Sequence, residues 1–148
     1  QEIIGIVSFS DPFPRKTTDD RVIFPGHVGV VYQAMNAAYL GRGTGRTIRV
    51  LPNGRVVSDR VISKIRAKEQ GWEYCTRMLR EFGAGEPDPD NLRPWLNEWL
   101  PKLTRRYSHP GNYKYAWILP KKLRERMPVR LQYPKVTIRP DRVPAIPQ

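Results

Sequence analysis

The segments that decide the fold are IIGIVSFSDP at residues 3–12 and GHVGVVYQAMNAAYLG at residues 26–41. The first is a run of branched apolar residues before a turn-forming Asp-Pro, and it predicts a strand at residues 3–9 that is buried on both faces. The second has apolar residues at helical spacing before a glycine, and it predicts a helix over residues 27–40. Functional side chains of α/β folds gather where strands end and helices begin.

The predicted helix offers one polar pair to a ligand. Tyr32 and Asn36 are one helical turn apart, so both side chains can touch the same bound molecule. The alternative is a tyrosine at the edge of the core and a solvated amide. The face expected to pack on the sheet comprises Val28, Val31, Met35 and Ala38.

Three blocks of sequence carry a family resemblance. They are SFSDP at residues 8–12, the G-x-x-G-x-x-Y-Q-A-x-N-x-x-Y-x-G pattern at residues 26–41, and YKYAWILPKK at residues 113–122. In this order and spacing they resemble the phage Mom-type DNA modification proteins. No resemblance is found between about residues 67 and 109.

The resemblance implies both a fold and an activity. The Mom-type proteins share the fold of the GNAT acyltransferases, and they convert adenine in duplex DNA to an N6-carbamoylmethyl form that resists restriction enzymes. We therefore expect an α/β fold with a GNAT-like mixed sheet flanked by helices, in which residues 3–9 are the fifth strand. The glycine-rich loop that binds the donor in GNAT enzymes precedes this strand, so the N-terminal half of the fold is expected to be lacking.

The resemblance also assigns roles to residues. Tyr32 matches a helix tyrosine that protonates the leaving group in GNAT enzymes, and an ionised Asp11 would accept a proton or hydrogen bond from the adenine amino group. An Asp-Pro turn without a catalytic role is the alternative for Asp11. The expected catalytic residues are Asp11, Tyr32, Ser8 and His27. The expected donor- or base-binding residues are Gln33, Asn36 and Gly29, and the donor suggested by the fold is of the acyl-coenzyme A type.

The charge of the chain indicates an anionic partner. Its 26 lysines and arginines exceed its 14 aspartates and glutamates, which gives a formal net charge of +12 over 148 residues. Such a surplus on a small protein favours nucleic acid over a membrane, so double-stranded DNA is the expected partner. The residues expected to contact it are Arg42, Arg46, Arg105, Arg106, Lys114, Lys121 and Lys122.

Other features restrict the setting. No apolar run approaches transmembrane length, so no membrane partner is expected, and a single cysteine, Cys75, excludes an internal disulfide. A single cysteine favours a reducing cytoplasm, and the resemblance to phage proteins implies that of a bacterial host. His27 and His109 have no zinc-site spacing, and we predict no structural metal. The missing N-terminal half, or a second copy in a homodimer, is the expected protein partner.

The remaining segments predict a domain over residues 1–127 with an extended Pro/Arg-rich tail at residues 128–148. A strand at residues 47–51 enters an Asn-Gly hairpin, and helices follow at residues 60–70 and 72–82. A third helix begins after Asn91 and is interrupted at Pro101. Helical spacing of Trp95 and Trp99 favours core packing over base stacking. We expect residues 71–103 to be a helical insertion.

Two other functions fit the same sequence. A non-catalytic DNA-binding module would keep the basic surface, show salt-dependent duplex binding and leave bases unmodified. A GNAT-type N-acetyltransferase would act on a different amine and bind coenzyme A.

Overall fold

The computed structural model describes residues 3–126, 128 and 130–135, and it is a mixed α/β structure with antiparallel sheets and several helices. The chain divides into two compact units. The first comprises the described residues within Gln1–Arg15, Phe24–Arg46 and His109–Gln148. The second comprises Lys16–Ile23 and Thr47–Ser108. A single domain over residues 1–127 with a helical insertion at residues 71–103 stays a prediction.

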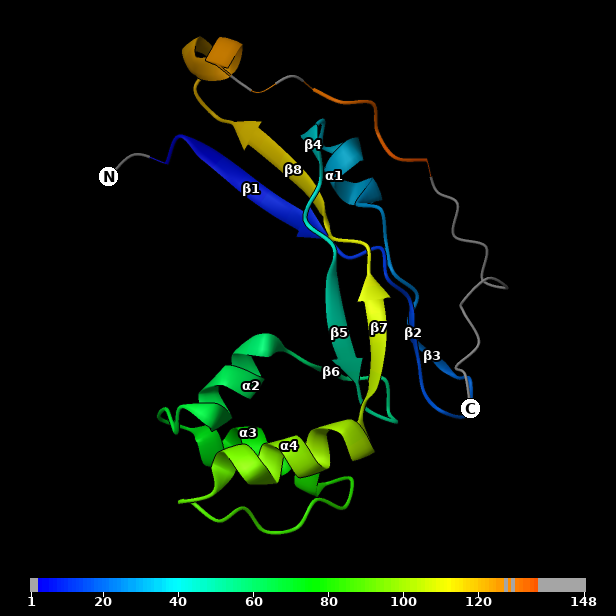
Figure 1. Cartoon of the computed structure of the whole chain (residues 1–148). Coiled ribbons are helices and arrows are strands. Elements are labelled where there is room, and N and C mark those ends of the chain that lie inside the picture. The colour runs from blue at the N-terminus through cyan, green and yellow to red at the C-terminus, as the bar shows by residue number, and fades with distance from the viewer. Residues whose placement is uncertain (1–2, 127, 129, 136–148) are drawn as a thin grey trace. The chain divides into compact units, whose positions relative to one another are not determined.

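The first unit is built on a three-stranded sheet. Strands β1 (Gly5–Ser10), β8 (Tyr113–Ile118) and β4 (Ala38–Arg42) lie in the order β1-β8-β4, and both neighbouring pairs are antiparallel (Figure 1). The β1–β8 register runs from Gly5 opposite Ile118 to Ser10 opposite Tyr113. The strands predicted near residues 3–9 and 113–119 are therefore confirmed.

The predicted burial of the first strand is wrong. β1 is an edge strand, and the side chains on both of its faces are largely exposed. Among the described residues of this unit, only a short α-helix and a 3-10 helix accompany the sheet, so the covering layers that a fully buried strand needs are not formed. The exposed apolar side chains of this segment are Ile3, Ile4, Ile6, Val7 and Phe9.

The predicted helix at residues 27–40 is also wrong in extent. Helix α1 covers only Val30–Ala34, and the chain then turns into β4. Asn36 has a φ of 58°, a left-handed conformation that ends a helix. Tyr32 and Asn36 are therefore not one turn apart on a helix. The four residues expected to pack on the sheet do not form one face. Val28 and Ala38 are buried, whereas Val31 and Met35 are exposed.

Two small sheets complete the strands. One pairs β2 (Arg15–Lys16) with β3 (Val22–Phe24), and the other has the order β6-β5-β7. Its members are β5 (Arg46–Val50), β6 (Val56–Val57) and β7 (Arg105–His109). The predicted Asn-Gly hairpin is confirmed: β5 and β6 are antiparallel, and the Asn53 side chain accepts the Arg55 N–H at 3.1 Å.

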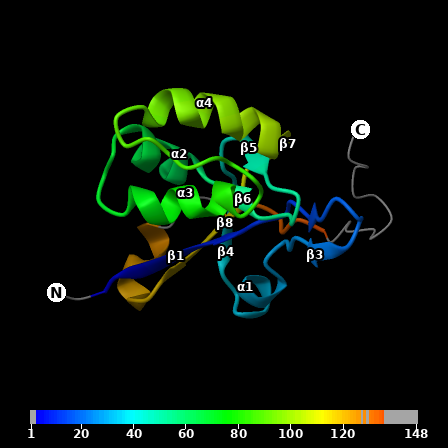
Figure 2. The same cartoon turned by 90° about the horizontal axis from the view of Figure 1, so that it is seen from below.

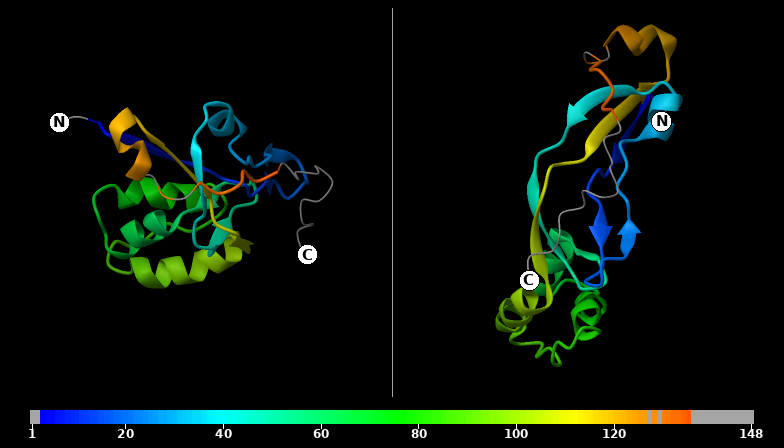
Figure 3. Two further views of the ribbon diagram at one scale, coloured as in Figure 1. Left: turned by 90° about the horizontal axis from the view of Figure 1, so that it is seen from above. Right: turned by 90° about the vertical axis from the view of Figure 1, so that its right-hand side faces the viewer.

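Three helices form the core of the second unit. They are α2 (Asp59–Arg66), α3 (Trp72–Arg80) and α4 (Leu92–Leu103), which group together in Figures 2 and 3. Trp95 is buried and Trp99 packs against the same cluster, which confirms core packing for both. Fully or nearly fully buried members of this core are Leu51, Val57, Ile65, Leu79, Leu96 and Leu100.

Two helix ends differ from the prediction. α2 stops at Arg66 instead of residue 70, since Lys68 has a φ of 50°. α4 continues through Pro101 to Leu103, because a proline in the last turn removes only one backbone hydrogen bond. Within the described part of the chain, no helix is both long and apolar enough to span a bilayer.

After β8 the chain returns toward the sheet. The 3-10 helix η1 (Lys121–Arg126) follows β8, and Leu131 then pairs with Tyr39 of β4. The Tyr133 hydroxyl donates to the Ala37 carbonyl oxygen at 2.6 Å. These contacts tie the first described residues of the predicted tail to the sheet, and residues 136–148 lie outside the described residues.

Candidate functional site

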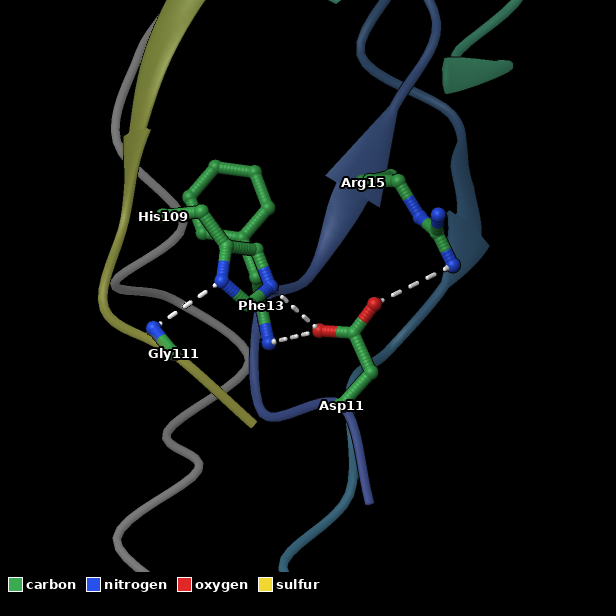
Figure 4. A network of polar contacts seen from close by, with 5 residues as sticks. All are labelled: Asp11, Phe13, Arg15, His109 and Gly111. Atoms are coloured by element: carbon green, nitrogen blue, oxygen red, sulfur yellow. Dashed lines mark hydrogen bonds and ion pairs between the residues drawn. The ribbon is translucent and has the colours of Figure 1, made fainter. Parts of the chain in front are cut away.

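A buried histidine holds the carboxylate that follows β1. Asp11 Oδ1 lies 2.9 Å from His109 Nε2 and accepts the Phe13 backbone N–H at 2.9 Å, and Oδ2 lies 3.7 Å from an Arg15 nitrogen. Figure 4 shows the carboxylate between the His109 ring and the Arg15 guanidinium. The Asp11 side chain is 27% exposed and that of His109 is 2% exposed. The carboxylate is thus fixed by the protein and still open to solvent.

The hydrogen bonds of His109 define its tautomer. The Gly111 backbone N–H donates to Nδ1 at 3.0 Å, so Nδ1 carries a lone pair and no proton. Nε2 then carries the hydrogen and donates it to Asp11 Oδ1. His109 is accordingly a neutral hydrogen-bond donor, and its bond to Oδ1 holds the Asp11 carboxylate in one orientation.

This arrangement suits Asp11 to proton transfer. Its partners are the Phe13 amide, the His109 imidazole and the more distant Arg15 guanidinium, and together they fix the orientation of the carboxylate. Oδ2 is engaged by the 3.7 Å ion pair with Arg15, which leaves a lone pair for an incoming proton. An oriented, ionised and partly exposed carboxylate has the properties of a general base.

Tyr32 belongs to an aromatic cluster on the same unit. Its ring centroid lies 5.4 Å from that of Tyr115 and 5.8 Å from that of Trp117. The Tyr115 hydroxyl donates to the Val28 carbonyl oxygen, and Gln33 Nε2 donates to the same hydroxyl at 3.1 Å. The cluster therefore fixes α1 and the residues before it against β8.

The buried phenols of this cluster stay protonated at neutral pH. Burial raises the pKa of Tyr115 above its ordinary value, although the hydrogen bond from Gln33 opposes the shift. Burial likewise raises the pKa of Tyr39, and the nearby Tyr113 adds to the effect. Both groups thus act as structural hydrogen-bonding and packing groups rather than as proton carriers near pH 7.

The predicted catalytic residues all lie in the first unit but have different neighbours. Asp11 contacts His109, whereas the Tyr32 ring contacts Tyr115, Trp117 and His27, the last at 6.4 Å. His27 joins the two groups, because its backbone N–H donates to the Asp11 carbonyl oxygen at 2.8 Å. The His27 side chain is exposed, and Ser8 lies half-buried in the middle of β1 opposite Tyr115.

The residues expected to hold an acyl donor do not fit that role. Gln33 Nε2 donates to the Val28 carbonyl oxygen at 3.2 Å as well as to Tyr115, and Gly29 is buried against Tyr115 and Tyr32. The Asn36 side-chain oxygen accepts from Arg130 at 3.2 Å. Internal contacts occupy Gln33, Gly29 and the side-chain oxygen of Asn36, so we derive no step through a coenzyme A donor.

Gly29 gives a test of this packing. It has a φ of 80°, and an added Cβ would lie 2.7 Å from Tyr115 Cε2. We expect Gly29→Ala to lower the free energy of unfolding by about 1–3 kcal/mol from backbone strain alone, with the clash adding to it. Gly83→Ala is the matched control, because Gly83 has a φ of 98° but nothing within 4 Å of an added Cβ. Urea denaturation that gave equal losses for both variants would contradict the packing described here.

The basic residues fall in both units. Lys114, Lys121, Lys122 and Arg46 are exposed in the first unit, and Arg105 and Arg106 are exposed in the second. Arg42 is also engaged internally: it donates to the Tyr113 hydroxyl at 2.5 Å, and its guanidinium lies 4.7 Å from that ring centroid.

One cationic cluster lies in the second unit. Burial lowers the pKa of the Arg49 guanidinium from its ordinary value, and the positive charges of Arg106 and Arg66 lower it further. Phosphate groups are the anions that such clusters bind on nucleic acids, and binding would relieve this repulsion.

Comparisons with family models, with curated proteins and with solved structures found no match for this chain. The candidate site is therefore defined by its own geometry. Among the described residues, no group of three or more His, Cys, Asp or Glu side chains is placed to hold a metal ion.

His109 is the site residue that sequence reasoning missed. It lies 98 positions from Asp11, so no local spacing connects the two. One signal was present: in His109-Pro110-Gly111, a turn can direct the glycine N–H back to the histidine ring. This turn predicts how the His109 ring is oriented, but it does not predict that the ring binds the Asp11 carboxylate.

Proposed function

We propose that this protein is a DNA-modifying transferase that alters the N6 amino group of adenine, with Asp11 as the general base. The observation that carries the proposal is the Asp11 carboxylate held by neutral His109 directly after β1, within the SFSDP block that resembles the Mom-type proteins. The net charge of +12 supports a nucleic-acid substrate.

The role of Asp11 follows from the chemistry of an amino group. The transferred group comes from a donor molecule that carries it on a leaving group. As the new bond to adenine N6 forms, the bond between the group and its donor breaks and the leaving group takes that electron pair, while the N6 nitrogen gives one proton to the Asp11 carboxylate. His109 keeps the carboxylate oriented by donating from Nε2, and the Phe13 amide supports the same oxygen. Adenine N6 is paired in duplex DNA, so the base would be flipped at a cost of a few kcal/mol. Contacts to phosphates offset that cost.

A second candidate function is a basic DNA-binding module without catalysis. It is favoured by one observation: Gln33 and Gly29, expected to bind the donor, are closed by internal contacts with Tyr115. The two functions differ in what they leave on the DNA. DNA that was bound by a non-catalytic module is unchanged once the protein is removed, whereas DNA treated by a transferase keeps its altered bases.

The proposed function is tested by restriction digestion. Plasmid DNA is isolated and deproteinised from bacteria that express the protein, and it is cut with enzymes whose sites contain adenine. We expect resistance compared with plasmid from cells that carry the empty vector. Equal cutting of both plasmids, together with salt-dependent duplex binding by the purified protein, would instead support the binding module.

The salt dependence of duplex binding tests whether the basic residues contact DNA, independently of any base modification. Lys121 and Lys122 are exposed on η1, so the double variant Lys121→Gln/Lys122→Gln should bind duplex DNA more weakly. Each lost phosphate contact should reduce the slope of log K against log salt by about 0.9. Arg77→Gln on α3 is the control, since its guanidinium lies 5.5 Å from the Tyr74 ring. Fluorescence anisotropy at several salt concentrations measures the slope, and an unchanged slope in the double variant would exclude these lysines.

A further inference from the structure

A separate cavity lies at the other end of β8 from Asp11. Asp11 follows Ser10, which is paired with Tyr113 at the start of β8, whereas the cavity uses the last residues of that strand. Its volume is about 510 Å³, within the range of about 300–1,000 Å³ typical of small-molecule sites. The lining residues are Met35, Asn36, Ala116, Trp117, Ile118, Arg124, Pro128 and Arg130.

The charged residues of the lining are both arginines. The Arg130 guanidinium donates to the Asn36 side-chain oxygen at 3.2 Å and to its backbone carbonyl oxygen at 3.0 Å, so the cation is held in place. Arg124 makes no hydrogen bond or ion pair with any described residue. Among the described residues no carboxylate lines the cavity, and its two cations favour an anion.

The lining also contains an aromatic side chain and apolar side chains. The Trp117 indole N–H donates to the Met35 carbonyl oxygen at 3.0 Å, and the ring lies nearly perpendicular to Tyr32 at 86°. These contacts fix the indole, which makes it a rigid surface for stacking a planar ring. Met35 and Ile118 add apolar surface beside it.

We propose that this cavity binds a nucleotide. The base packs along Trp117, the phosphate binds between Arg124 and Arg130, and the Asn36 side-chain amide is available to the edge of the base. Arginine guanidinium groups bind phosphate through charge-assisted hydrogen bonds, and an aromatic side chain supplies the stacking partner that a base requires. The lining alone carries this inference, so it stands whether or not the proposed DNA modification is confirmed.

The test is isothermal titration of the purified full chain with deoxyadenosine 5′-monophosphate at low salt. We expect Arg124→Gln to weaken binding by about 10- to 100-fold, because the variant loses charge-assisted hydrogen bonds to the phosphate. Arg130→Gln should weaken it at least as much, because that change also releases Asn36. Arg93→Gln, at an exposed position on α4, is the matched control and should bind like the wild type. Thermal melts of the variants show whether each remains folded.

Two more ligands test the parts of the nucleotide. Deoxyadenosine lacks the phosphate and inorganic phosphate lacks the base, so each should bind more weakly than the complete nucleotide. No binding of the nucleotide, or binding unchanged in folded Arg124→Gln, would overturn the proposal. Equal binding of inorganic phosphate and the nucleotide would also overturn it, because the site would then recognise only an anion.

The source of the nucleotide is resolved by two further titrations. Coenzyme A carries a phosphorylated adenosine at one end of a small molecule, and a short single-stranded oligonucleotide carries nucleotides within DNA. Binding of either probe that is lost in Arg124→Gln supports the site and identifies its source. If neither probe binds but the free nucleotide does, and its binding is lost in Arg124→Gln, the ligand is a free nucleotide; failure of the free nucleotide to bind overturns the proposal whatever the two probes do.

Discussion

Asp11→Asn is expected to reduce adenine modification by about 10²–10⁴-fold, the usual contribution of a general base. Asparagine has nearly the same shape, and its side-chain oxygen can still accept the Phe13 N–H and the His109 Nε2–H. The variant therefore keeps the local hydrogen bonds but cannot accept the proton. Mass spectrometry of nucleosides, normalised to the amount of protein, measures the loss.

The fold of Asp11→Asn should change little. The ion pair lost with Arg15 is 3.7 Å long and partly exposed, so it contributes only about 0–1 kcal/mol. Asp90→Asn is the matched control, since Asp90 is an exposed carboxylate with a 3.6 Å ion pair to Lys68. Full modification activity in a folded Asp11→Asn variant would remove the carboxylate from the mechanism.

His109→Phe is expected to affect both stability and activity. The change keeps a ring beside Phe13, whose centroid lies 5.4 Å away, but it leaves the Gly111 N–H without its acceptor. A buried donor without a partner costs about 1–3 kcal/mol. Urea denaturation should show this loss, and modification should fall because Asp11 is no longer oriented.

A conservative variant separates positioning from structure. His109→Gln can donate from its amide to Asp11 and should recover part of the activity, even if its stability resembles that of His109→Phe. A role in stability alone would make activity follow the folded fraction in both variants. Activity that is unchanged in folded His109→Phe would show that Asp11 does not need this partner.

Local sequence signals predicted the second unit well. Asn53 at the hairpin, the buried stripe of α3 and the buried Trp95 of α4 each follow from turn chemistry or helical spacing over a few residues. Such elements are determined by neighbours in sequence, so reading the chain in order is sufficient to find them.

The first unit was harder to predict because pairing between distant strands decides it. Residues 38–40 were included in the predicted helix, yet Ala38 pairs with Ala116 and Tyr39 with Tyr115 in the sheet. The positive φ of Asn36 permits the turn between α1 and β4. Apolar periodicity alone does not reveal which partner a segment will meet, so tertiary packing overrode it.

The candidate site was predicted in part for the same reason. Asp11 stood out within its sequence block, and the structure places it at the end of β1 with its carboxylate held. Its orienting partner, His109, lies 98 positions further along the chain, so no motif spacing predicted the contact. The expected donor residues were chosen by resemblance, and the contacts of Gln33 with Val28 and Tyr115 could not be read from sequence.

The most direct measurement is nucleoside mass spectrometry of DNA from bacteria that express the wild-type protein. We expect a new adenine nucleoside whose mass corresponds to a carbamoylmethyl group in place of one N6 hydrogen, and none in cells with the empty vector. Detection of unmodified deoxyadenosine alone, with the protein present and folded, would contradict the assignment of Asp11 and His109 to DNA modification.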